Sequence, residues 1–335
     1  MLFRWAMGDV DTSTLLPLTG DKQKKVVRMA KMSILSFQLH FPLQRFCVFY
    51  NGKNFDLFCS VFEKTCPALP CEVELYNARD FETGYHFEPP SGVWWKWVPF
   101  RFDIEDTEIS VDTDIICLSR PKNLVDCIQQ SEGLVVIDDF AEQMGEWVVG
   151  NLWEQFREEL EGKFPVNSGL LVMKPGVSFL RDFLAATTHT SPDQKWWEQH
   201  GGLHRMVGSG SHAFAAPGEQ YQCNTHFIDE QGCINLGIHR SGEPFVALDR
   251  EVNVYGLELF EHLERGVEVE TVHFLAGTKQ LFWELEPYLF RKFYDQAYSF
   301  SELVSDVRSL KSSLVRPEDS ALFGLPVVDA SMSAY

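Results

Sequence analysis

The first fifty residues alternate between extended and helical patterns, and this order restricts the fold more than any other feature of the chain. Leu2–Met7 is a short apolar run, and Arg45–Tyr50 has the β-branched and aromatic content of a buried strand. Between them, Lys22–His40 places apolar residues at mostly helical spacing. A strand, helix, strand order is typical of a parallel unit. We therefore predict an α/β protein with a mixed, mainly parallel sheet flanked by helices.

Later segments extend this pattern toward the C-terminus. Further strands are predicted at Cys71–Tyr76, Gly133–Ile137 and Val269–Leu275, and a helix limited by Pro99 at Trp94–Phe102. Residues 191–217 are rich in Gly, His and Ser and resemble an inserted loop. We predict one domain over residues 1–298, followed by a C-terminal helix and a weakly ordered tail over residues 299–335.

Two carboxylates, Asp112 and Asp114, separate the apolar runs Ile109–Val111 and Ile115–Leu118. Residues two apart in an extended chain point to the same side, so Asp-Thr-Asp can offer both carboxylates to one cation. Mg²⁺ and Mn²⁺ prefer oxygen ligands and commonly bridge a protein carboxylate to substrate phosphates. Asp is also common in solvated turns after strands, so this motif indicates a metal site only when further residues support it.

The net charge of −19 over 335 residues argues against a broad basic surface for nucleic acid or anionic membrane. The sequence contains no apolar run long enough to span a bilayer and no secretory signal pattern. The eight cysteines are scattered, as free thiols in a reducing compartment are. We expect a soluble, cytoplasmic protein.

Several polar groups recur in an order that resembles the nucleotide-sugar glycosyltransferases of the GT-A fold, and most of all glycosyltransferase family 8, the glycogenin and galactosyltransferase group. The resemblance covers most of the chain to about residue 285. It rests on the order and spacing of Trp95-Lys96, Asp112-Thr-Asp114, Asn167-Ser168-Gly169, Glu219-Gln220 with Asn224, and His273 with Gly277 and Lys279.

The resemblance implies a GT-A, Rossmann-like fold and a metal-dependent transfer of a hexose from a nucleotide diphosphate sugar, expected to be a UDP-sugar, with retention at the anomeric carbon. It assigns Asp112, Asp114 and His273 to the metal. Imidazole suits Mn²⁺ better than Mg²⁺, so Mn²⁺ is the expected ion and Mg²⁺ the alternative. Lys279, in a loop relieved by Gly277, and Lys96 would contact phosphate or sugar.

Asn167 and Ser168, in a predicted turn that opens into a strand, carry short hydrogen-bonding groups suited to sugar hydroxyls. Glu219 and Gln220 match the family's Asp-Gln motif, which lies against the transferred sugar. The family usually has Asp where Glu219 stands, and Lys-Pro-Trp where this chain has Lys279-Gln-Leu-Phe-Trp283. A competing pair, Asp193-Gln194, lacks the later Asn.

Two other functions stay open. Asp9 and Asp11, with Asp138-Asp139 later, resemble fragments of a haloacid-dehalogenase-type phosphohydrolase, which would use Asp9 as nucleophile and Asp11 as acid/base. A non-catalytic binding protein with the GT-A fold is the other. Zinc could be bound by residues of the types found in Cys223, His226, Cys233 and His239, but their spacing is not that of the common zinc fingers.

The expected partners are the nucleotide-sugar donor and an acceptor that the sequence does not identify. The acceptor hydroxyl could belong to a saccharide, a protein side chain or a small molecule. A nucleic-acid base is the least expected acceptor, because the protein is strongly acidic.

Overall fold

The computed structural model describes residues 1–8, 20–87, 89, 92–139, 143–150, 152–189, 225–256, 258–274, 278–295 and 299–314. Their central feature is a sheet of seven strands in the order β3-β2-β1-β4-β7-β6-β8. The strands are β1 Leu2–Met7, β2 Arg45–Tyr50, β3 Glu74–Asn77, β4 Glu108–Val111, β6 Leu134–Asp138, β7 Val166–Met173 and β8 Phe245–Ala247.

All neighbours in this sheet are parallel except β7, which runs antiparallel to both β4 and β6. The predicted mixed, mainly parallel sheet is therefore confirmed. Within the described ranges a second, three-stranded sheet has the order β5-β10-β9. It consists of β5 Ile115–Cys117, β10 Thr271–His273 and β9 Asn253–Tyr255.

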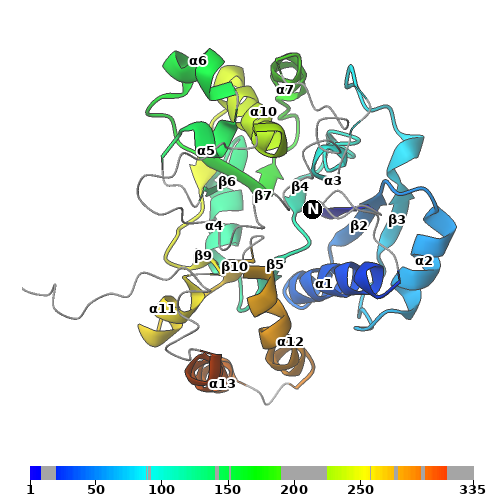
Figure 1. Ribbon diagram of the computed structural model, residues 1–335, viewed down its shortest axis with the longest axis vertical. Coiled ribbons are helices and arrows are strands. Elements are labelled where there is room, and N and C mark those ends of the chain that lie inside the picture. Colours follow the sequence, from blue (N-terminus) through cyan, green and yellow to red (C-terminus); the bar gives the residue numbers. More distant parts are fainter. Residues whose placement is uncertain are drawn as a thin grey trace, which may run out of the picture.

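Helices cover both faces of the main sheet (Figure 1). One face packs on α1 Asp21–Gln38, α2 Phe55–Lys64 and α4 Lys122–Gln130. The other packs on α5 Glu146–Val149, α6 Leu152–Leu160, α7 Leu180–Thr187 and α10 Thr225–Ser241. The remaining elements are a 3₁₀ turn at Ala78–Asp80, α3 Gly92–Trp95, α11 Leu259–Glu264, α12 Lys279–Tyr294 and α13 Phe300–Leu314.

Strand alternation explains why the sheet is buried on both sides. In β1, Phe3, Trp5 and Met7 belong to the core under α1, and Leu2 belongs to a separate cluster on the opposite face. In β7, Leu170 and Val172 face one core while Leu171 and Met173 face the other. A strand that is apolar on both sides is what a sheet with two helical layers requires.

Two local predictions from the sequence are corrected, and one helix was not predicted. The helix predicted at Trp94–Phe102 is only the short α3, since Pro99 has no N–H and disfavours helix at the residue before it. Asn167-Ser168-Gly169 is not a turn before a strand but part of β7, at an irregularity where the β6 register jumps from Val136 opposite Leu171 to Ile137 opposite Asn167. The sequence reading also missed α10.

A buried ion pair connects β1 to β4 and to the segment before β4. Arg4 is 1% exposed and Glu108 is fully buried, and their side chains are 2.6 Å apart. Arg4 also donates to the carbonyl oxygens of Lys96, at 2.9 Å, and Pro99, at 2.8 Å. The second Glu108 oxygen accepts from the backbone N–H of Phe102 at 2.8 Å. Three hydrogen bonds from the guanidinium and both oxygens of the carboxylate are therefore in use, as a buried ion pair requires.

The described residues include no helix with the length and apolar character needed to cross a membrane.

We expect Glu108→Leu to destabilise the fold by about 3–5 kcal/mol, because it leaves the Arg4 guanidinium buried without its counter-charge. The double variant Arg4→Met/Glu108→Leu removes both charges of this pair and should recover part of that loss, since Arg101, whose Nε lies 3.5 Å from Glu108, still loses its counter-charge. Urea denaturation of the two variants and the wild type measures both effects. Equal destabilisation by the single and double variants would contradict a charge-pairing role.

Candidate functional site

Asp112, Asp114 and His273 come together where the two sheets meet. Asp112 and Asp114 lie in the loop between β4 and β5, and His273 ends β10, opposite Ile115 of β5. The Phe274 N–H donates to the Asp114 carbonyl oxygen at 2.9 Å, which locks the two segments together. His273 Nε2 lies 3.4 Å from Asp114 Oδ1 and 3.9 Å from Asp112 Oδ2.

One ligand atom from each of these three residues lies within 4.8 Å of the others. Two carboxylates and one imidazole form a donor set that could hold a divalent cation. Burial alone would raise the pKa of Asp114, but Lys279 and His273 beside it hold that pKa well below its ordinary value. The carboxylate is therefore ionised over the whole physiological range and ready to bind a cation.

Two lysines flank the carboxylates. Lys96 Nζ lies 2.7 Å from Asp112 Oδ1 and also donates to the Ser168 carbonyl oxygen. Lys279 Nζ lies 3.3 Å from Asp114 Oδ2, at the start of α12. Lys96 is only 5% exposed, so its charge is fixed in position, whereas Lys279 is about a third exposed. The site thus places cationic groups on either side of the candidate metal ligands.

The His273 ring is confined between an aromatic ring and a glycine. Tyr255 stacks on it with ring centroids 5.5 Å apart. On Gly169, a Cβ atom would lie 2.4 Å from His273 Cε1, which is closer than any real contact. The same Gly169 offers its carbonyl oxygen to the Asp112 N–H at 2.7 Å. Gly169 is therefore required where the bulge of β7 passes the imidazole.

A second set of polar side chains surrounds the irregularity in β7. Ser168 Oγ donates to Glu230 at 3.3 Å, and the Trp97 indole N–H donates to the same carboxylate. Asn167 Nδ2 donates to Gln231 Oε1 at 3.3 Å. Glu230 and Gln231 belong to α10. Because Lys96 donates to Ser168, this polar set adjoins the carboxylate site.

Glu230 and Gln231 were missed by the sequence analysis, although a signal was present. The pattern Glu-Gln followed four residues later by Asn occurs twice, at Glu219-Gln220 with Asn224 and at Glu230-Gln231 with Asn235. The second copy lies at the site, and Asn235 bonds the backbone of Val166 at the start of β7 at 2.8 Å through both its amide atoms.

Some predicted positions lie outside the described residues. These are Glu219, Gln220, Asn224, Gly277, Asp9, Asp11, the pair Asp193-Gln194 and the loop over residues 191–217. Among the zinc candidates, Cys223 and the side chain of His226 are also outside, Cys233 is fully buried in the apolar core, and His239 Nε2 lies 2.8 Å from the Phe164 carbonyl oxygen.

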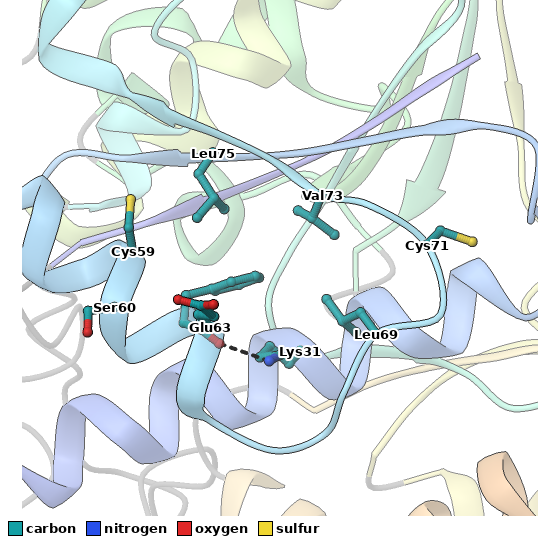
Figure 2. A pocket seen from close by; sticks show the side chains of 9 residues that line it. Lys31, Cys59, Ser60, Glu63, Leu69, Cys71, Val73 and Leu75 are labelled. Carbon is teal, nitrogen blue, oxygen red and sulfur yellow. Dashed lines mark hydrogen bonds between the residues drawn. The ribbon is translucent and has the colours of Figure 1, made fainter.

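A cavity of about 500 Å³ opens elsewhere, between α1, α2 and β3 (Figure 2). Its walls are mostly apolar, and Lys31 donates across its floor to the Phe62 carbonyl oxygen at 2.8 Å. Its lining residues are Lys31, Cys59, Ser60, Phe62, Glu63, Leu69, Cys71, Val73 and Leu75. None of them belongs to the carboxylate site, so the cavity and the chemistry are separate.

Comparison with known proteins finds no protein-family model and no curated protein that matches this chain. The solved structures that are similar to it include the following three. A galactosyltransferase, LgtC, in complex with donor and acceptor sugar analogues is 14% identical, with 95% of this chain and 99% of that chain covered and a TM-score of 0.45. The bifunctional glycosyltransferase WbbM is 12% identical, with 91% and 51% covered and a TM-score of 0.48. Mouse xyloside xylosyltransferase 1 is 13% identical, with 83% and 99% covered and a TM-score of 0.42.

Burial raises the pKa of the Glu230 carboxyl to about 7 from an ordinary value of 4.5, although the Lys96 charge opposes the shift. Between these pH values the folded protein binds more protons than the unfolded chain, so this group's contribution to stability falls as pH rises. Glu230→Gln keeps an uncharged side chain, and we expect it to gain stability relative to the wild type as pH rises from 4.5 to 7. Thermal denaturation at several pH values measures this difference, and a constant difference would contradict the assignment.

Proposed function

We propose that the chain is a metal-dependent GT-A glycosyltransferase that moves a hexose from a nucleotide diphosphate sugar, with UDP as the expected nucleotide, to an acceptor hydroxyl. The observation that carries the proposal is the cluster of Asp112, Asp114 and His273 between two lysines. Such a cluster suits a diphosphate, which needs a cation and further positive charge when it departs.

The residues divide the work by their chemistry. Asp112, Asp114 and His273 would hold Mn²⁺, which neutralises the diphosphate when bound. Lys279 is part-exposed and can reach a phosphate, while buried Lys96 keeps Asp112 and the Ser168 backbone in place and is available to a sugar hydroxyl. We expect Gly277 to relieve the loop that leads into α12, which begins at Lys279.

The polar set around β7 is suited to sugar hydroxyls. Ser168, Asn167 and Glu230 present donors and acceptors within one hydrogen-bonded group. We assign to Glu230 and Gln231 the sugar-facing role that the family resemblance placed on Glu219 and Gln220, because the second pair adjoins Ser168 and Lys96. Retention of the anomeric configuration remains the expectation from the resemblance to family 8.

The acceptor is proposed to be a saccharide, a protein side chain or a small molecule. A phosphohydrolase built on Asp9 and Asp11 would leave this arrangement without a use. Asp139, which follows β6 and is part of the phosphohydrolase resemblance, instead accepts hydrogen bonds from Asn167 and Gln231 of the polar set, at 3.1 and 3.0 Å.

Donor binding should raise the thermal stability of the protein, since a ligand that binds only the folded state stabilises it by about 2.7 kcal/mol at 100 times its Kd. We expect one UDP-sugar to raise the denaturation temperature in the presence of Mn²⁺ and to have little effect in the presence of EDTA. A panel of UDP-, GDP- and ADP-sugars identifies the donor. A response only to Mg²⁺ with a phosphate mimic would instead support the phosphohydrolase.

Asp114→Asn should weaken Mn²⁺ binding by more than the roughly 10–100-fold that loss of an outer-shell partner typically costs. Metal-dependent release of UDP should disappear with it. Electron paramagnetic resonance of free Mn²⁺ measures binding without any turnover. The control is Asp126→Asn on α4, an exposed carboxylate paired with Lys122, which should bind Mn²⁺ as the wild type does. Wild-type Mn²⁺ affinity in Asp114→Asn would refute the metal assignment.

A further inference from the structure

Asp139 is a buried carboxylate at the end of β6, with only 4% of its surface exposed. Its backbone N–H donates to the Pro165 carbonyl oxygen at 2.9 Å, which ties it to the chain just before β7. A buried carboxylate is costly unless polar groups surround it. Asp139 therefore needs hydrogen-bond donors around its carboxylate, and two side-chain amides provide them.

Both amides donate to the same oxygen. Gln231 Nε2 lies 3.0 Å from Asp139 Oδ2, and Asn167 Nδ2 lies 3.1 Å from it. An ionised carboxylate only accepts hydrogen bonds, so it can face only the NH₂ end of each amide. Asp139 thereby favours one orientation of both amides, a choice that amide shape alone leaves open, and the Val148 carbonyl oxygen, which accepts from Gln231 Nε2 at 3.4 Å, favours the same orientation of Gln231.

The oxygens of the two amides consequently turn toward the bulge of β7. Asn167 Oδ1 accepts from the Gly169 N–H at 2.8 Å, and Gln231 Oε1 accepts from the Ser168 N–H at 3.5 Å. If either amide were reversed, its NH₂ group would face a backbone N–H, and two donors would oppose each other. The Asp139 carboxylate and the backbone of β7 therefore favour the same orientation of both amides.

This orientation reaches the carboxylate site through the backbone of β7. Ser168 offers its carbonyl oxygen to Lys96, and Gly169 offers its own to the Asp112 N–H. A buried group that fixes the donor and acceptor pattern at a reacting centre acts before the reaction begins, by preorganisation.

We propose that Asp139 is a positioning residue for sugar transfer, which holds the Gln231 and Asn167 amides in the one orientation that presents the Gln231 oxygen toward β7. Its effect on turnover rests on the proposed function, whereas its effect on the amides does not. Asp139 acts through Gln231 and contributes no ligand to the metal cluster.

The first test observes the amide directly. In protein labelled with ¹⁵N-glutamine, the Gln231 side-chain resonance is assigned by its loss in Gln231→Glu. We expect this resonance to lie apart from those of exposed glutamines in the wild type and to move toward them in Asp139→Ala. Asp139→Asn keeps the shape of the side chain and serves if Asp139→Ala does not fold. An unchanged Gln231 resonance in a folded Asp139 variant would overturn the proposal.

The second test uses a double-mutant cycle on turnover with the best UDP-sugar. Asp139→Ala should lower kcat roughly 10–100-fold, the usual range for an outer-shell orienting group, and leave Mn²⁺ affinity unchanged. On a Gln231→Ala background the same change should lower kcat much less, because only the action of Asp139 through Asn167 is left. Equal losses on both backgrounds would show that Asp139 acts independently of Gln231 and would overturn the proposal.

The two tests separate the proposal from the proposed function. If wild-type protein turns over no nucleotide sugar, the proposed function fails while the nuclear magnetic resonance experiment still decides whether Asp139 orients the amide. If turnover is present and the Gln231 resonance does not shift in the Asp139 variants, the proposed function survives and the positioning role fails.

Discussion

The pairing of Arg4 with Glu108 is the constraint on which the arrangement of the site depends. Two charges removed from water are stable only when each of their hydrogen-bonding groups has a partner. Arg4 finds its partners in the carbonyl oxygens of Lys96 and Pro99, and Glu108 in the N–H groups of Phe102 and Asp103. The irregular segment between α3 and β4 is thereby fixed to the centre of the sheet. Lys96 is the first residue of that segment, so the backbone from which its ammonium group contacts Asp112 is held in place.

The irregular part of β7 fixes the other side of the site. A regular strand would point Asn167 and Ser168 to opposite faces and keep every backbone group in the ladder. Where the register with β6 shifts, the Ser168 carbonyl oxygen accepts from Lys96, while the bond from the Asp112 N–H to the Gly169 carbonyl oxygen continues the register of β4 with β7. Asp112, Lys96 and Gln231, from three separate segments, thus all bond to this short stretch of backbone.

The sequence predicted those parts of the site whose chemistry is local. Asp112 and Asp114 stand two apart between apolar runs, whereas His273 was grouped with them only through the resemblance to family 8 glycosyltransferases. The helix α10 was not predicted, because Gly232 and Gly237 are poor helix formers. In the folded chain these glycines allow close packing: a Cβ on Gly232 would lie 2.6 Å from the Val149 carbonyl oxygen, and one on Gly237 would lie 3.0 Å from the Phe183 nitrogen. Tertiary contact thus overrode propensity, and with α10 the pair Glu230-Gln231 was missed.

The place of β7 in the sheet also affects the order in which the protein can be built. β4 and β6 are complete once residue 138 has been made, yet the strand that separates them begins only at Val166. Until then, the edge of β4 that will receive β7 and the matching edge of β6 have no partner, and two unpaired edges can join each other or another chain. A nascent chain of this protein therefore passes through an interval in which it is prone to mispair, and the insertion of β7 both ends that interval and completes the site.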